Sequence, residues 1–132
     1  EMRFHSLQEA KRDIFHKIKR REVFVTNQNN KIVGLFIYSK NYSHDANYLE
    51  YIIVPKNYRR KGIAKKLLSK YIEVSRIETP KKQRYALSST HLTNNISIKM
   101  HLNFGFEKMG VLKKLHYGQD EIFFGYDLRK VK

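Results

Sequence analysis

Cysteine is absent from this chain of 132 residues, and no uninterrupted apolar run approaches the ~20 residues that span a bilayer. The absence of cysteine excludes disulfides and thiolate metal sites, so we expect a reducing compartment, the cytoplasm. The N-terminal region is charged throughout and lacks the apolar stretch of a signal peptide. We therefore expect neither secretion nor a membrane partner.

Acidic residues are also scarce. Asp and Glu number 12 against 27 Lys and Arg, which gives a net charge of +15. Such a charge attracts polyanions, which include nucleic acid, anionic lipid and phosphorylated small molecules, and composition does not choose among them. The basic residues are dispersed along the whole chain, which is weaker evidence for one docking face than a single cluster.

Hydrophobic residues make up 41% of the chain, enough for the core of one domain, which we expect to cover residues 1–132. Apolar periodicity predicts helices over about 5–20, 60–74 and 95–103, with Thr93 or Asn94 as the N-cap of the last helix and Gly105 after its end. Alternating or continuous apolar runs predict strands over 23–26, 32–38, 48–55, 84–89, 106–117 and 121–128. Turns or polar loops are expected at 27–30, 41–47, 78–83 and 118–120.

A basic turn stands between the third predicted strand and the second predicted helix, in the stretch NYRRKGIAKKLL (57–68). A helix N-terminus has unpaired backbone amides and a partial positive charge, and Gly62 lets a ligand approach the backbone closely. The turn is therefore either an anion site suited to a pyrophosphate or simply a solvated, basic helix start. It is neither a Walker loop nor a Rossmann fingerprint.

Two motifs resemble those of the GNAT (Gcn5-related N-acetyltransferase) superfamily. RRKGIA (59–64) matches the family's Q/R-x-x-G-x-G/A loop, and NNISIKMHLNFGF (94–106) resembles its second motif. The resemblance covers about residues 22–128. It implies an α/β (α+β) fold with a mixed, mostly antiparallel central sheet flanked by helices. It also implies acetyl transfer from acetyl-CoA to a primary amine by direct attack in a ternary complex. The family normally opens with a strand and two helices, whereas only about 22 residues precede the first predicted hairpin here, so we expect either a shortened N-terminal region or a preceding segment that this chain lacks.

The resemblance also implies a set of cofactor-binding residues. The strand backbone at Ile52, Ile53 and Val54 would bind the pantetheine arm, and Asn94 matches an asparagine that commonly contacts it. The pyrophosphate would be held by the backbone amides of the loop and the start of the helix, with Arg59 nearby. The loop residues concerned are Arg60, Lys61, Gly62, Ile63, Ala64 and Lys65.

Glu50 and His101 are the candidate catalytic residues. Glu50 is the single carboxylate of a nearly continuous apolar strand and matches a position that often carries the family's general base; the alternative is a strand residue that faces solvent or pairs with a lysine. His101 stands where the family usually has a tyrosine that protonates the CoA sulfur, and histidine titrates near neutral pH. The alternative is a partly buried structural histidine. Ser89 occupies a position where the ribosomal-protein acetyltransferases carry a catalytic glutamate, which argues against their mechanism here.

Histidines show no ligand spacing, so we expect no metal; they are His5, His16, His44, His91, His101 and His116. The acceptor is expected to be an amine on a small molecule or a peptide, with an acidic or nucleic-acid-associated partner also suggested by the charge. A rival interpretation is a basic nucleic-acid-binding module on a GNAT-like fold without turnover, although no helix-turn-helix or RNA-stacking motif supports it. We expect a monomer or homodimer.

Overall fold

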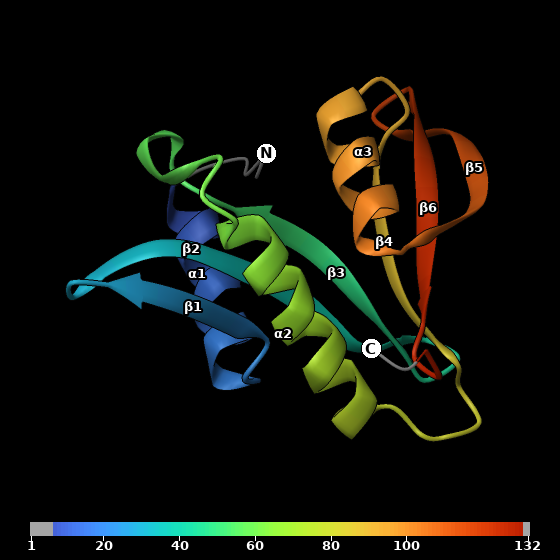
Figure 1. The fold of residues 1–132 in the computed structure, drawn as a ribbon, viewed down its shortest axis with the longest axis horizontal. Coiled ribbons are helices and arrows are strands. Elements are labelled where there is room, and N and C mark those ends of the chain that lie inside the picture. Colours follow the sequence, from blue (N-terminus) through green and yellow to red (C-terminus); the bar gives the residue numbers. More distant parts are fainter. Residues whose placement is uncertain (1–6, 131–132) are drawn as a thin grey trace.

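Six strands form one sheet in the order β1-β2-β3-β4-β6-β5 in the computed structural model of this chain, which describes residues 7–130 (Figure 1). The strands are β1 (Val23–Gln28), β2 (Lys31–Ser43), β3 (Ala46–Ile53), β4 (Tyr85–His91), β5 (Glu107–His116) and β6 (Gln119–Asp127). The helices are α1 (Leu7–Lys19), α2 (Ile63–Glu78) and α3 (Asn95–Phe104), with a short 3₁₀ helix, η1 (Lys56–Tyr58).

The β3–β4 pair is parallel and the other four strand pairs are antiparallel, so the expected mixed, mostly antiparallel sheet is confirmed. Helix α2 crosses one face of β1–β3, α3 lies beside β4 and β6, and α1 lies behind β1–β3 on the other face (Figure 1). The predicted order of helices and strands is confirmed throughout. Phe4 and His5, which the sequence places in or near the first helix, lie outside the described residues.

The predicted polar loop at 41–47 is wrong. Strand β2 continues to Ser43 and β3 begins at Ala46, so the two strands form a long hairpin. His44 and Asp45 form its turn, with φ of 49° and 69°. Two consecutive left-handed residues make the tight turn that joins twisted antiparallel strands, and short polar side chains tolerate that conformation.

Helix α2 begins three residues later than expected and extends beyond the expected end at Val74 to Glu78. Its start is delayed because Arg60 and Gly62 have φ of 64° and 77°, a left-handed conformation that a right-handed helix excludes. Its end comes just before Thr79 and Pro80, since the residue before a proline disfavours the helical conformation.

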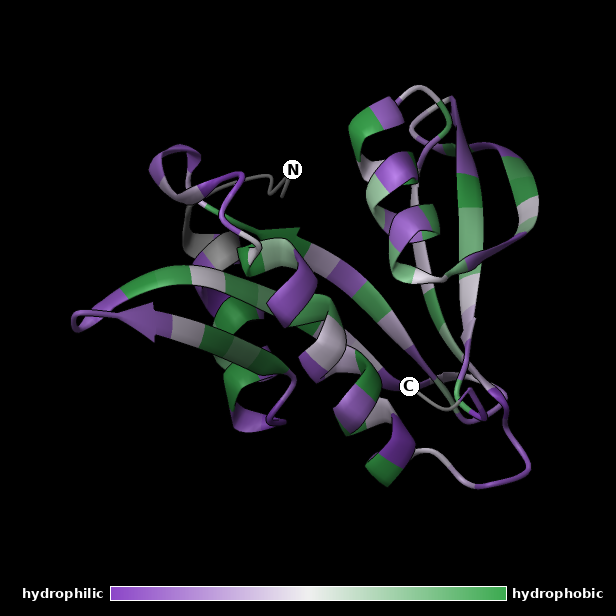
Figure 2. Ribbon diagram, in the orientation of Figure 1, coloured by the Kyte–Doolittle hydropathy of each residue, from purple (hydrophilic) through white to green (hydrophobic). Residues whose placement is uncertain are grey.

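The core lies between α2 and the sheet. Figure 2 shows hydrophobic residues on α2 and along β1–β3, and buried aromatic rings meet there: the ring of Tyr71 lies 5.8 Å from that of Phe36 and 5.9 Å from that of Tyr38. Gly34 brings β2 close to α2, because a Cβ at Gly34 would lie 2.9 Å from the Ile63 side chain. None of the helices in the described part of the chain is long and apolar enough to cross a bilayer.

Candidate active site

The two central strands separate soon after they meet. β4 pairs with β3 only at Leu87 opposite Tyr48 and at Ser88 opposite Leu49, whereas β2 stays paired with β3 as far as Ile53. Beyond Leu49, the edge of β3 that faces β4 therefore has no strand partner, and its backbone groups can bind an extended ligand. Ile52 and Ile53 lie in this open segment, and Val54 follows its end.

The basic turn joins the end of this open strand to α2. The first α-helical bond runs from the Lys66 amide to the Gly62 carbonyl, so the amides of residues 63–65 have no partner within the helix. Arg60 and Gly62 have a left-handed backbone conformation, so the chain curls just before α2. Left-handed residues in a turn can direct successive N–H groups toward one concave point. The turn thus offers several amide donors and the positive end of the α2 dipole to an anion.

The side chains of the turn keep this surface open. A Cβ at Gly62 would have no atom within 4 Å, so the space beside Gly62 is open. Arg59 Nε donates to the Val54 carbonyl at 2.9 Å, which ties the turn to the end of β3, and Lys61 Nζ lies 5.7 Å from the centre of the Tyr58 ring. Amides, open space and exposed cations fit a pyrophosphate group.

Helix α3 begins beside the diverging end of β4. The Asn94 side-chain oxygen caps it by accepting from the Ser97 amide at 3.1 Å, which decides between the two predicted caps. Because the cap uses the oxygen, the exposed NH₂ group of Asn94 remains able to donate to a ligand.

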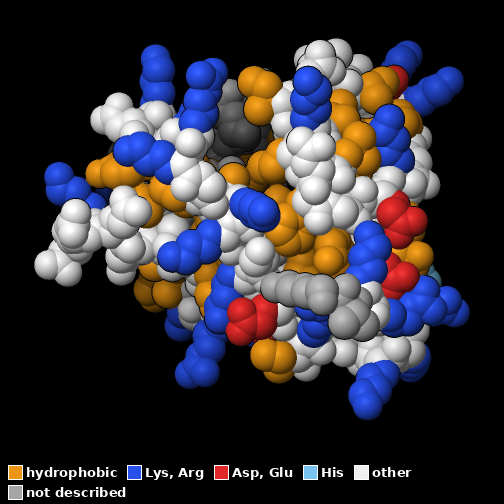
Figure 3. Space-filling model, viewed as in Figure 1, with side chains coloured by type: hydrophobic (Ala, Val, Ile, Leu, Met, Phe, Trp, Pro, Cys, Tyr) orange, Lys and Arg blue, Asp and Glu red, His pale blue; other side chains and the backbone are white. Residues whose placement is uncertain are grey.

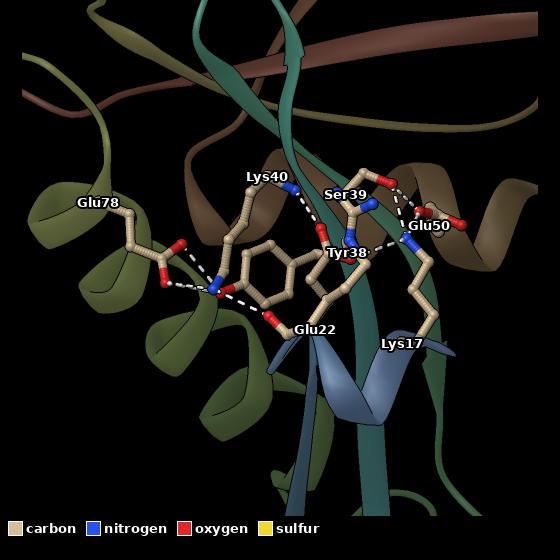
Figure 4. Close-up of polar contacts among 8 residues, drawn as sticks. Lys17, Glu22, Tyr38, Ser39, Lys40, Glu50 and Glu78 are labelled. Carbon is tan, nitrogen blue, oxygen red and sulfur yellow. Dashed lines mark hydrogen bonds and ion pairs between the residues drawn. The ribbon is translucent and has the colours of Figure 1, made fainter. Parts of the chain in front are cut away.

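Glu50 points to the sheet face that α1 covers. Lys17 of α1 and Ser39 of β2 both donate to its Oε2 atom, and Lys17 also donates to the Tyr38 carbonyl at 3.1 Å (Figure 4). Among the described residues, none donates a hydrogen bond to Glu50 Oε1, and the side chain is 24% exposed. The lysine-paired alternative is therefore observed, and it leaves one carboxylate oxygen facing outward.

Two further carboxylates, Glu22 just before β1 and Glu78 at the end of α2, lie near Lys17 and Tyr38 (Figure 4). Glu22 is fully buried and lies 3.6 Å from Lys17 and 2.8 Å from Arg20. On the α2 side, the Tyr38 hydroxyl donates to Glu78 at 2.9 Å, and burial together with this carboxylate raises the pKa of Tyr38 far above its ordinary value. The Lys17 ammonium thus lies between Glu22 and Glu50, and the Tyr38–Glu78 contact joins the end of α2 to β2.

His101 is 2% exposed and lies between α3 and the sheet. Its Nδ1 donates to the Ser97 carbonyl at 2.7 Å, because a carbonyl only accepts, and its Nε2 therefore accepts from the Ser88 hydroxyl at 2.7 Å. The ring stacks on Phe124 at 4.4 Å, and burial lowers its pKa. This geometry is that of the structural alternative, and a proton-donor role for His101 stays a prediction.

Residues 1–106 match the profile of the Acetyltransferase (GNAT) family. The chain belongs to this family. The resemblance inferred from the two sequence motifs is thereby confirmed.

Solved GNAT structures share the fold. An acetyltransferase of the GNAT family from Bacillus cereus ATCC 10987 superposes with a TM-score of 0.76 at 28% identity, over 94% of this chain and 82% of that one. An N-acetyltransferase from Staphylococcus aureus Mu50 gives 0.74 at 25% identity, over 95% and 79%. A GNAT acetyltransferase from Elizabethkingia anophelis with acetyl-CoA bound gives 0.74 at 14% identity, over 89% and 82%, which shows the fold alone. None of the curated proteins compared with this chain matches it.

The structure also contains a polar chain, the successive hydrogen bonds that join Tyr48, Ser89 and Glu121, which the sequence did not predict. Ser89 donates to Glu121 Oε2 at 2.6 Å, and because that hydroxyl proton is used, the Tyr48 hydroxyl donates to Ser89 at 2.6 Å. Burial raises the pKa of Tyr48 to about 12, which keeps its hydroxyl protonated. Strand pairing alone brings these residues together, since Glu121 lies 32 positions after Ser89.

Positive charge is spread over the face of the molecule in Figure 3. On the face in Figure 3, Lys and Arg side chains stand apart from one another and surround hydrophobic patches. The dispersed pattern seen in the sequence persists on this face, and nothing in the described part of the chain favours the nucleic-acid-binding alternative.

Proposed function

We propose that this GNAT domain transfers the acetyl group of acetyl-CoA to a primary amine by direct attack in a ternary complex. One observation carries the proposal: the unpaired edge of β3 leads directly into a turn of exposed amides and cations. An unpaired strand edge suits an amide-bearing arm, and the turn suits a pyrophosphate. Acetyl-CoA contains both, and when bound it supplies the activated acetyl thioester.

The residues that hold acetyl-CoA in this proposal lie along one continuous path. The backbone of Ile52 and Ile53 in β3 and of Val54 just after it binds the pantetheine arm, with the free NH₂ group of Asn94 as a further donor. The amides from Arg60 to Lys65 bind the pyrophosphate, and Arg59 adds a full charge beside them. An unpaired β3 amide also serves as the donor that polarises the thioester carbonyl.

Glu50 is the proposed general base. Its outward-facing Oε1 accepts the proton of the incoming amine, directly or through one water, while Lys17 and Ser39 hold the other oxygen. Because Lys17 comes from α1, the amine must approach on the face of the sheet that α1 covers. No covalent intermediate with the enzyme is proposed, since the chain has no cysteine and the described serines lack a triad.

The test is calorimetric titration with acetyl-CoA, followed by an assay of CoA release with a thiol reagent over a panel of amines. The chain contains no cysteine, so the reagent reports only the released CoA. The panel holds free amino acids, lysine-containing peptides and peptides with a free N-terminus, each with neutral and acidic members to probe the +15 charge. Absence of saturable acetyl-CoA binding would refute the proposal.

A further inference from the structure

Three side chains that could ligate a metal meet where β4 and β5 end and β6 begins. One nitrogen each from His91 and His116 and one oxygen of Glu121 lie within 4.8 Å of one another. His91 is the register partner of Glu121, and His116 ends β5 beside the β5–β6 turn. Spacing along the chain hid this cluster, because the antiparallel pairing of β6 with both neighbours brings the three together.

Two atoms of this cluster are buried and lack a hydrogen-bond partner among the described residues. Glu121 is 7% exposed, and neither its Oε1 atom nor His91 Nδ1 has a hydrogen-bond partner among the described residues. His116 Nδ1 lies 3.4 Å from Glu121 Oε1, yet the two form no hydrogen bond. An unpaired buried polar atom is costly and native structures keep few of them, and a bound ion is one of the groups that satisfies such atoms.

From this geometry we propose that His91, His116 and Glu121 form a binding site for a divalent transition metal, with Zn²⁺ as the best match. Neutral imidazole nitrogens and a carboxylate oxygen are the donors that Zn²⁺ takes at about 2.0–2.1 Å, which places tetrahedral ligands about 3.4 Å apart. The distance from His116 Nδ1 to Glu121 Oε1 already has this value. Small side-chain rotations bring His91 to the same spacing, and a fourth position stays open for water or another ligand.

The polar chain behind the cluster orients the carboxylate. The Ser89 hydroxyl occupies Glu121 Oε2, and Tyr48 in turn donates to Ser89, so Oε1 is the oxygen left for the metal. Such outer partners are typical of metal-bound carboxylates, and they raise affinity by fixing the ligand. A cation also compensates the buried charge of Glu121, which has no lysine or arginine paired with it in the described part of the chain.

The test is titration of the chelator-treated protein with Zn²⁺ by calorimetry and with Co²⁺ by visible absorption. We expect one equivalent to bind, with the absorption of a low-coordinate Co²⁺ site. Removal of a ligand should weaken binding by more than the roughly 100-fold that loss of an orienting partner costs; the variants are His91→Ala, His116→Ala and Glu121→Gln. Removal of the orienting hydroxyl in Ser89→Ala should weaken binding by about 10-fold. His44→Ala, in the exposed β2–β3 turn, binds as the unaltered chain does.

Failure of the unaltered protein to bind one equivalent overturns the proposal, as does undiminished binding by His116→Ala and Glu121→Gln. His116 is 31% exposed, so its truncation leaves the fold intact even where Glu121→Gln disturbs it, and melting without metal confirms this. The readout is metal binding itself. It is independent of acetyl-CoA, so this proposal and the proposed acetyl transfer fail or succeed separately.

Discussion

Substitution of Gly62 separates a pyrophosphate site from a merely basic helix start. Gly62→Ala and Gly62→Glu both place a side chain at φ +77°, which costs an L-residue about 1–2 kcal/mol. The Cβ of either variant fits, because a Cβ there meets nothing within 4 Å. The glutamate also places a negative charge at the N-terminus of α2, which stabilises a helix by about 0.3–1 kcal/mol. Gly62→Glu should therefore unfold at the same or a higher denaturant concentration than Gly62→Ala.

Binding should change in the opposite direction. A glutamate about 6 Å from a diphosphate with two charges is repelled by about 1.4 kcal/mol even at the dielectric constant of water. That energy corresponds to a tenfold increase in Kd, and the lower dielectric of a protein surface increases the effect. The expected order of affinity for acetyl-CoA is the unaltered chain, then Gly62→Ala, then Gly62→Glu by a further tenfold or more.

Calorimetric titration with acetyl-CoA and denaturant unfolding of the same samples provide the measurement. Gly118→Glu is the matched control, since Gly118 also has a positive φ of 85° and open space around it, but lies in the β5–β6 turn. It should lose comparable stability and bind acetyl-CoA normally. Equal affinity of Gly62→Ala and Gly62→Glu, within twofold, would refute the reasoning and leave the turn as a charged helix start.

The remaining predictions concern proton transfer and packing. Glu50→Gln should lower kcat by about 100-fold with acetyl-CoA affinity unchanged, and near-normal turnover would exclude it as the base. His101→Phe should lower kcat by a similar factor if His101 donates a proton, whereas kcat within a few-fold of normal would identify it as structural. Because burial lowers the pKa of His101, the unfolded chain takes up a proton before the folded chain does as pH falls below ~6.5, so the free energy of unfolding decreases there. In denaturant unfolding across pH, His101→Phe should reduce this dependence of stability on pH. Gly34→Ala should cost about 1–3 kcal/mol of unfolding free energy through contact with α2, and an unchanged denaturation midpoint would contradict this.

Local patterns predicted most of the fold. The apolar faces of α2 and the apolar run of β3 identified the central elements, and two motifs with their spacing identified the family. The errors fall where pairing or turn geometry overrides composition. Residues 41–47 look like a loop because they are polar, yet two left-handed residues let the hairpin continue. Phe15 and Ile18 recur at helical spacing, yet they are 57% and 56% exposed, so periodicity alone did not establish burial.

Sequence order and local chemistry thus determined the elements, the basic turn and the GNAT motifs, because each depends on residues adjacent along the chain. Tertiary structure alone decided which groups meet across the sheet. It pairs Glu50 with Lys17, surrounds His101 with Ser88 and Phe124, and brings His91, His116 and Glu121 together. The register of β4 against β6 and the placement of α1 set these contacts, and neither follows from local propensity, since both depend on packing between segments far apart in the chain.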